Sequence, residues 1–547
     1  MKKISINIIY LSVILILSYL FFFHNIGNYS LKEPDEGRYA EIPREMIELH
    51  DYAVPHLNYV RYFEKPPLFY WIVAFSYKAF GISEWSFRFP NALSALLCVI
   101  ILYLFVRRWF NEEVAFISSI VLMSSFGFFS MARIVTLDMF FTLWLFLSLL
   151  LFYGYYREKI PFLLYSFYAS LALATLAKGP VAVLLVGITI LIFLFTEKKI
   201  SFLKEFKWIT GILIYGVITI PWLLAISLKE KDFFYFFFID QHLLRFLTSK
   251  HKRTGSMFYF FPVLFGGMFP WSIFIPRGIV SLWRKNELRL LIIWTLVVFA
   301  FFSISKSKLP PYILPVFPPL SIIIGYMFHK KWEEVIERKR EVIISTFIFF
   351  ILSTSAFLCM SSTFNEWIGN ISKDAIDILR DLRAFSIYIS LVSIISGCFL
   401  CFKRFDKFSF VFSIFTVFSS LVVFMLMLNV NIIDRLNTTK RLSNVINYHK
   451  GGIDYLINYG SFEETLPFYT KKRVILASYK GELEMGSKYE DTKDLFMNEE
   501  DFINLFASDK KVFCVLKEKK IKRLKERLSE RINIVICQNE RCLIYNH

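Results

Sequence analysis

Two short stretches near the N-terminus place acids and a base where they could take part in a reaction. EPDEGRYAEIPREM contains two neighbouring carboxylates, Asp35 and Glu36, and YFEKPP contains the pair Glu64 and Lys65 directly before two prolines. A carboxylate close to a hydroxyl group can act as a general base, and a lysine fixed in place beforehand can stabilise a developing negative charge. We therefore expect these stretches to belong to a site that handles an anionic ligand.

Three further candidates follow at wide intervals along the chain. Asp138 lies in TLDMFF, Lys178 stands before Gly179 and Pro180, and Arg245 closes the aromatic segment DQHLLR. A planar guanidinium can contact a phosphate through two hydrogen bonds, so Arg245 suits the same ligand as the lysines. The alternative is that the long cationic side chains only reach from apolar helix ends to the membrane surface.

The composition indicates that the elements positioning these residues are membrane helices. Hydrophobic residues make up 56% of the 547 residues, aromatic residues 19% and charged residues only 20%. Apolar stretches near or above the roughly 18 to 20 residues that cross a bilayer predict about thirteen transmembrane helices. We expect them at 4–23, 88–106, 114–130, 137–156, 160–177, 180–196, 208–228, 256–276, 288–304, 311–328, 341–362, 384–402 and 409–430.

The charges between these helices predict the topology. The segment 67–80 is short for a crossing and begins with two prolines, so we interpret it as a re-entrant or interfacial helix. If the N-terminus is cytoplasmic, basic clusters such as Arg107-Arg108 and the run 329–340 stay inside, as the positive-inside rule requires. The candidate residues and the first outer loop, 24–66, then lie outside, together with the C-terminus.

The tail differs in character from the rest of the chain. RVILASY, KVFCVL and INIVIC have the short apolar runs of strands, and LKEKKIKRLKERLSERI has the pattern of an amphipathic helix. We predict a membrane domain over 1–430 and a soluble α/β domain over 431–547 on the outer side. Cys537 and Cys542 in this tail could form a disulfide or stay free, and the sequence leaves both alternatives open.

Several functions are disfavoured by what the sequence lacks. Neither GxGxxG nor GxxxxGK[ST] occurs, so we expect no nucleotide cofactor, and we expect no nucleic-acid partner. A transporter should hide ionisable residues at mid-membrane and often shows repeated halves, whereas the charges here gather at one face and no internal repeat is evident. We therefore favour an enzyme, with a lipid or solute transporter as the alternative from another class.

The order of the motifs resembles that of a known enzyme superfamily. EPDEGRYAEIPREM, YFEKPPLFYW, RFPNALSALL, ARIVTLDMFFTLW, LAKGPVAVLL, the DQHLLRF loop and SKSKLPPYILPVFPPL follow one another as in the GT-C glycosyltransferases, which use a polyprenyl-phosphate sugar. The chain is most similar to the branch of the lipid A aminoarabinose transferases and their protein mannosyltransferase-like relatives. The resemblance implies a GT-C fold and an inverting transferase that takes a sugar from undecaprenyl phosphate at the periplasmic side of a bacterial inner membrane.

The resemblance also implies roles for the candidate residues. It suggests catalytic roles for Asp35, Glu36 and Asp138, lipid-phosphate contacts for Tyr39, Tyr62, Lys65, Lys178 and Arg245, and a divalent metal (zinc, magnesium or manganese) at Glu64 and His242. Two protein ligands are fewer than the three usual in catalytic zinc, so lipid phosphate or water would have to complete the shell. An interfacial role for His242 and a helix-capping role for Glu36 remain as alternatives.

The acceptor and the donor sugar stay open in the sequence. Lipid A phosphates or core sugars suit the branch that the chain resembles, and protein hydroxyls or another envelope glycan are alternatives. The pair Glu64 and Lys65 departs from the HPP-type sequence of eukaryotic protein O-mannosyltransferases, which weakens the protein-acceptor interpretation. The donor could carry aminoarabinose, a hexuronic acid or a neutral hexose, and we expect the protein to act as a monomer among membrane lipids.

Overall fold

The computed structural model describes residues 2–245, 255–330, 438–449, 452–528, 531–538 and 540–546. Three predicted spans, 341–362, 384–402 and 409–430, lie outside the described residues. The chain divides into two compact units. The first comprises Met1–Asn25, Asn91–Ile220 and His242–Asn429, and the second comprises Ile26–Pro90, Pro221–Gln241 and Val430–His547. The predicted domain boundary at 430/431 falls outside the described ranges, so it stays a prediction.

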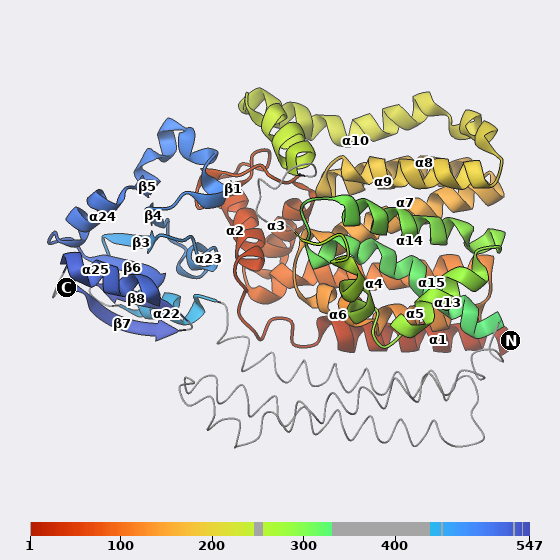
Figure 1. Cartoon of the computed structure of the whole chain (residues 1–547), viewed down its shortest axis with the longest axis horizontal. Helices are drawn as coiled ribbons and strands as arrows, with labels where there is room; N and C mark the ends of the chain where they lie inside the picture. Colours follow the sequence, from red (N-terminus) through yellow and green to blue (C-terminus); the bar gives the residue numbers. More distant parts are fainter. Residues whose placement is uncertain are drawn as a thin grey trace, which may run out of the picture. The chain divides into compact units, whose positions relative to one another are not determined.

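The first unit is built from helices that run side by side (Figure 1). Its elements, together with two helices that it shares with the second unit, α4 and α10, are α1 (Lys2–Ser18), η1 (Tyr19–Phe23), α4 (Glu84–Trp109), α5 (Glu112–Met123), α6 (Phe126–Arg133), α7 (Leu137–Glu158), α8 (Pro161–Lys178), α9 (Val181–Thr196), η2 (Ile200–Phe206), α10 (Trp208–Lys229), α12 (Phe260–Gly267), η4 (Ser272–Phe274), α13 (Ile275–Leu282), α14 (Asn286–Ile304), η5 (Pro310–Val316) and α15 (Phe317–Lys330). Each predicted span within the described residues coincides with one to three of these helices.

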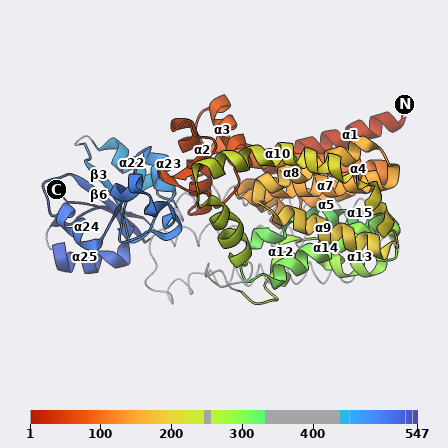
Figure 2. The same ribbon diagram turned by 90° about the horizontal axis from the view of Figure 1, so that it is seen from above.

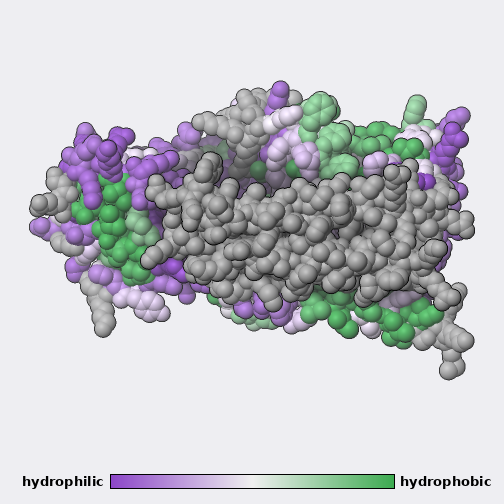
Figure 3. Space-filling model, turned by 60° about the horizontal axis from the view of Figure 1, so that its bottom comes forward, coloured by the Kyte–Doolittle hydropathy of each residue, from purple (hydrophilic) through white to green (hydrophobic). Residues whose placement is uncertain are grey.

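These helices have the lengths and surfaces of a polytopic membrane protein. In the described part of the chain, six helices are long and apolar enough to cross a membrane, and eight if each of two bent helix pairs counts as one crossing. Large apolar side chains such as Ile209, Val217 and Leu228 on α10 point outward, with 74% to 85% of their surface exposed. Hydrophobic side chains also cover much of the coloured outer surface of the helices in Figure 3. Lipid tails would cover such a surface, so the predicted fold class is confirmed.

Two spans predicted as continuous, 114–130 and 256–276, are broken in the structure. The pair Glu112–Met123 and Phe126–Arg133 is bent by 64°, and the pair Phe260–Gly267 and Ser272–Leu282 by 116°. The two breaks are joined by a backbone hydrogen bond, in which Phe126 N donates to Phe269 O at a distance of 3.0 Å. Glycine permits the close approach, since a Cβ on Gly127 would lie 3.0 Å from the Cα of Gly267.

The second unit combines the first outer loop with the tail. Its first-loop elements are α2 (Asp35–Glu48), β1 (His56–Leu57) and β2 (Val60–Arg61), α3 (Leu68–Phe80) follows the loop, and the π-helix η3 (Tyr235–Leu244) begins in this unit. Its tail elements are α22 (Lys440–Tyr448), β3 (Tyr455–Tyr459), α23 (Thr465–Thr470), β4 (Ile475–Ala477), η6 (Gly481–Leu483), η7 (Gly486–Lys488), η8 (Glu490–Leu495), β5 (Phe496–Met497), α24 (Glu499–Phe506), β6 (Val512–Lys517), η9 (Glu518–Lys520), α25 (Ile521–Leu528), β7 (Asn533–Gln538) and β8 (Arg541–Tyr545).

The tail strands form one six-stranded sheet in the order β5-β4-β3-β6-β8-β7. The first four are parallel, whereas β8 runs antiparallel to both β6 and β7. Helices α24 and α25 pack on one face through Phe502, Phe506 and Leu524, and α22 and α23 lie on the other face (Figure 2). The predicted α/β tail is confirmed, and a disulfide joins Cys537 on β7 to its cross-strand neighbour Cys542 on β8.

Within this unit, the first outer loop is bonded to the tail at two buried points. The Glu33 carboxylate accepts hydrogen bonds from the backbone amides of Glu464 and Thr465, each over 2.8 Å, at the start of α23. The Asn58 side chain both donates to Val474 O, over 2.7 Å, and accepts from Val474 N, over 2.9 Å. The loop that carries the predicted catalytic acids is therefore held by the tail.

Candidate active site

Asp35 is the first residue of α2, where the positive end of the helix dipole favours a carboxylate. Its side chain is 43% exposed, and its Oδ1 lies 3.6 Å from Nη1 of Arg38 one turn later. The structure thus leaves this predicted catalytic acid accessible to a substrate, with a cation beside it.

Glu36, the second predicted acid, points into the protein instead. Both of its oxygens accept hydrogen bonds from the Arg88 guanidinium, over 3.0 Å from Nε and 2.7 Å from Nη2. Arg88 is fully buried and also donates to the carbonyls of Ile26, Tyr29 and Ser30. This arrangement suits a residue that fixes the loop before α2. A catalytic role for Glu36 stays a prediction.

Arg38 forms the centre of a buried polar group beside Asp35. Its Nη2 lies 2.7 Å from Oε2 of Glu482, and its guanidinium lies 5.8 and 5.9 Å from the ring centroids of Tyr39 and Tyr62. The Tyr62 hydroxyl is 3.5 Å from the same Glu482 oxygen. Burial raises the pKa of Tyr62 well above its ordinary value, so this phenol remains a hydrogen-bond donor at neutral pH.

The loop carrying Glu64 and Lys65 is fixed from the residues before it. Phe63 is buried and packs edge-on against Phe233 and Phe236, with ring centroids 5.8 and 5.6 Å apart. The two prolines after Lys65 limit the backbone on the other side. Glu64 and Lys65 themselves are half-buried. The structure therefore holds a cation and an acid at a rigid bend, as expected for preorganised groups.

The first unit brings together three other predicted site residues. Lys178, at the end of α8, forms an ion pair with Asp138 in the first turn of α7. Gly179 follows with φ +100°, a backbone conformation that favours glycine and that ends the helix beneath the lysine. The Lys178 ammonium lies 4.6 Å from the ring centroid of Tyr312, and Arg245 Nη2 donates to the Tyr312 hydroxyl over 3.3 Å. Two cations thus flank one tyrosine, an arrangement suited to a phosphate group.

The metal expected at Glu64 and His242 stays a prediction, because the His242 side chain lies outside the described part of the structure. Within the ranges that the structure describes, no group of three or more His, Cys, Asp or Glu side chains could hold a metal ion. No chemical step is therefore assigned to a metal.

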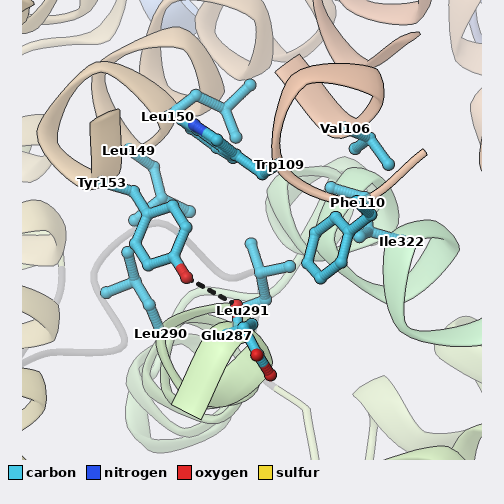
Figure 4. Close-up of a pocket in the computed structure, with 10 residues that line it drawn as sticks. All are labelled: Val106, Trp109, Phe110, Leu149, Leu150, Tyr153, Glu287, Leu290, Leu291 and Ile322. Carbon is cyan, nitrogen blue, oxygen red and sulfur yellow. Dashed lines mark hydrogen bonds between the residues drawn. The ribbon is translucent and has the colours of Figure 1, made fainter. Parts of the chain in front are cut away.

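An apolar cavity lies elsewhere in the first unit and differs in chemistry from these sites (Figure 4). Its walls come from α4, α7, α14, α15 and the residue after α4, and its lining consists of Val106, Trp109, Phe110, Leu149, Leu150, Tyr153, Glu287, Leu290, Leu291 and Ile322. The Tyr153 hydroxyl donates to the backbone carbonyl of Glu287 over 3.1 Å. Tyr153 follows Asp138 by 15 residues on α7, which corresponds to about 22 Å along the helix. The cavity is therefore remote from the predicted phosphate-binding residues of the same unit.

Comparisons with known proteins match two parts of the chain to family models. Residues 64–224 match the family model for dolichyl-phosphate-mannose-protein mannosyltransferases, and residues 454–546 match that for the aminoarabinose transferase C-terminal domain. The crystal structure of ArnT from Cupriavidus metallidurans bound to undecaprenyl phosphate superimposes with a TM-score of 0.83 at 24% identity, covering 99% of this chain and 98% of that chain. The chain therefore has the fold of that structure, a bundle of apolar helices followed by an α/β tail.

Curated relatives support the same grouping over part of the chain. The undecaprenyl phosphate-alpha-4-amino-4-deoxy-L-arabinose arabinosyl transferase 2 of Proteus mirabilis is 32% identical over 330 residues, which are 59% of this chain and 59% of that protein. The transferase of the same description from Yersinia enterocolitica is 34% identical over 55% of this chain and 56% of that protein. The matched region thus spans less than two thirds of these relatives.

The structure places several residues at these sites that the sequence alone did not indicate. Arg38 follows Asp35 by three residues on a helix, a spacing that predicts an ion pair and could have identified it. Arg88 was recognisable as an isolated charge at the start of an apolar helix, which demands a partner. Tyr312 lies in the SKSKLPPYILP motif without any feature that marks its role, and Glu482 reaches Arg38 from far along the chain.

Proposed function

We propose that this protein is a glycosyltransferase that moves a 4-amino-4-deoxyarabinose-type sugar from undecaprenyl phosphate to lipid A or lipopolysaccharide. The observation that carries the proposal is the match of the tail to the aminoarabinose transferase C-terminal domain, behind a mannosyltransferase-type membrane region in the same chain. The relatives that match a shared region are named for this donor, and the superimposed crystal structure contains undecaprenyl phosphate.

The reaction exchanges one bond to the anomeric carbon for another. An oxygen of the acceptor attacks that carbon from the face opposite the lipid phosphate, so the configuration inverts. The bond between the anomeric carbon and the phosphate oxygen breaks, and its electron pair leaves with undecaprenyl phosphate. The main demand on the protein is therefore to stabilise the extra negative charge on the departing phosphate.

The described residues divide this work between cations and an acid. Lys178 and Arg245, which both contact Tyr312, provide charge-assisted hydrogen bonds for a phosphate in the first unit, and Lys65 is the further cation that the sequence predicts for this ligand. No proton transfer is required of Asp138, because its carboxylate is already paired with Lys178 and fixes the direction of the ammonium. Asp35 orients the donor sugar if the acceptor is a phosphate, and deprotonates the acceptor if it is a hydroxyl.

The reaction is proposed to occur at the periplasmic face of the bacterial inner membrane, with the N-terminus in the cytoplasm and the protein acting as a monomer. The distribution of basic loops supports this orientation. It is tested by introducing single cysteines at Asp35 and at the exposed Glu484 in the tail. An impermeant thiol reagent applied to the periplasmic side should label both. Labelling of either position only from the cytoplasm would contradict the orientation.

The function is tested by mass spectrometry of envelope lipids from cells with and without the protein, followed by assays with purified protein and a synthetic donor. The expected product is lipid A with one added amino sugar on a phosphate. A product on a protein hydroxyl or another glycan would replace the proposed acceptor. Binding of the donor without any transferred sugar would instead favour a lipid transporter.

A further inference from the structure

The polar group around Arg38 has the features of a built binding site in the second unit. Its charged members are Asp35, Arg38, Glu464 and Glu482, and its aromatic members are Tyr39, Tyr62 and Tyr70. The phosphate-binding roles expected for Tyr39 and Tyr62 do not explain the carboxylates. The tail supplies two of these, so the site is incomplete without it.

An unused donor points into this group. Tyr70 is fully buried, and its hydroxyl has no hydrogen-bond partner among the residues that the structure describes. Its ring lies 6.1 Å from that of Tyr39, and its hydroxyl is within electrostatic range of Arg38 and Glu482. A buried hydroxyl without a partner is costly, so the position suits a polar ligand that would satisfy it.

The charge balance of the group is negative. Glu464 is buried close to Glu33, and burial followed by the charge of Glu33 raises the pKa of Glu464 well above its ordinary value, which favours its neutral form. Among the named members, Asp35 and Glu482 then carry negative charge and Arg38 carries positive charge, and Glu64 lies within electrostatic range of Tyr62 and Tyr70. One net negative charge attracts a cationic group and repels a carboxylate.

Glu482 is the member of the group that a ligand can reach from the tail. Its side chain is 32% exposed, whereas that of Arg38, to which it is bonded, is 4% exposed. Oε2 of Glu482 lies 2.7 Å from Arg38 Nη2 and 3.5 Å from the Tyr62 hydroxyl, and these two contacts restrain the carboxylate. A carboxylate fixed in this way can bind an ammonium group without losing much side-chain freedom.

We propose that Glu482 is a specificity-determining residue whose carboxylate binds the ammonium group of the donor sugar. The inference rests on the proposed function and adds to it a role of the C-terminal domain in choosing the sugar. The Tyr70 hydroxyl forms a hydrogen bond with the same sugar. A neutral sugar cannot make the charge-assisted contact with Glu482. A hexuronic acid would add its own carboxylate beside those of Asp35 and Glu482, which repel it.

The test uses purified full-length protein and three undecaprenyl-phosphate donors that carry 4-amino-4-deoxyarabinose, arabinose or a pentose-sized uronic acid. The measurement is kcat/KM for each donor with wild type, Glu482→Gln, Glu482→Asp and the control Glu484→Gln. Glu484 lies two residues away and is exposed, so its replacement makes the same change of charge outside the group. Wild type should use the three donors in the order cationic, neutral, anionic.

Glu482→Gln should lose about tenfold or more in kcat/KM for the amino sugar, mainly through KM, with little change for arabinose, because a charge-assisted hydrogen bond is lost only with the cationic donor. Glu482→Asp should retain part of the preference, and Glu484→Gln all of it.

An equal loss for all donors would reduce Glu482 to a partner of Arg38 and overturn the inference alone. A wild-type protein without preference among the donors would also overturn it, independently of how the variants fold. Transfer of none of the three by wild type would overturn the proposed function and this inference with it.

Discussion

The buried pair of Glu36 and Arg88 allows the structural and catalytic interpretations of Glu36 to be separated. The Arg88 guanidinium makes two hydrogen bonds to Glu36 and three to backbone carbonyls, at distances of 2.7 to 3.0 Å. Arg88→Met removes all five and leaves Glu36 as a buried carboxylate without its cation. Breaking one side of a buried ion pair costs about 3 to 5 kcal/mol, so this variant should be severely destabilised.

The double variant Glu36→Leu/Arg88→Met should be more stable than Arg88→Met alone. It removes the uncompensated charge, and the remaining cost is that of the three carbonyls, about 1 to 3 kcal/mol for each one that water cannot reach. We expect a coupling of roughly 2 to 3 kcal/mol between the two positions. The assay is chemical unfolding of the purified protein in detergent, monitored by tryptophan fluorescence, for wild type, both single variants and the double variant.

Activity of the double variant decides the role of Glu36. If Glu36 only holds the loop before α2, sugar transfer should return with stability, to within about tenfold of wild type. A folded double variant that has lost roughly 10² to 10⁴ in rate would assign Glu36 to the chemistry, because that is the typical loss on removing a general acid or base. Additive effects of the two single substitutions on unfolding would refute the reasoning about the buried pair.

Three further substitutions test other parts of the structure. Arg245→Ala should weaken binding of undecaprenyl phosphate about tenfold or more in a direct binding assay. The control Lys159→Ala, which removes an exposed cation at the far end of α7, should leave the affinity unchanged. Equal affinities of both variants would place Arg245 outside the site. Burial, together with Glu41, raises the pKa of Glu45 well above its ordinary value, so its contribution to stability is complete below the unfolded pKa and is lost as pH rises through the folded one. Glu45→Gln should therefore lose less stability than wild type as the pH rises above the ordinary pKa of a glutamate in unfolding titrations, and parallel curves would contradict this. Replacing Cys537 and Cys542 by serine should cost about 2 kcal/mol in the same unfolding assay, the loop-closure value for a short loop, and no change would indicate that the disulfide does not constrain the unfolded chain.

Hydrophobic patterning was sufficient to predict most helices and the α/β tail, because membrane spans and sheet cores are both read from runs of apolar residues. It could not predict the breaks in the spans at 114–130 and 256–276. Those breaks depend on contacts between segments far apart in the chain, such as Phe126 with Phe269. The strands β3 and β8 were missed for a related reason. They become identifiable through their pairing with β6.

The candidate site was predicted less completely than the fold, since its geometry depends on partners that sequence spacing does not reveal. Lys178 and Arg245 were selected as phosphate-binding cations, and their convergence on Tyr312 required the structure. Asp138 was selected as a catalytic acid, and its ion pair with Lys178 was not foreseen. In each case the sequence indicated the type of chemistry, while the structure supplied the neighbour that orients the side chain.

The three acids of EPDEG illustrate how local geometry separates residues that look equivalent in the sequence. Glu33 precedes α2 and bonds to the start of α23, so its carboxylate is used in holding the loop to the tail. Glu36 follows Asp35 by one residue, and about 100° of helical rotation turns it toward Arg88 and away from its neighbour. Asp35 alone of the three keeps a half-exposed side chain. If this loop provides a carboxylate for sugar transfer, the helix that begins at Asp35 leaves that residue as the one placed to do so.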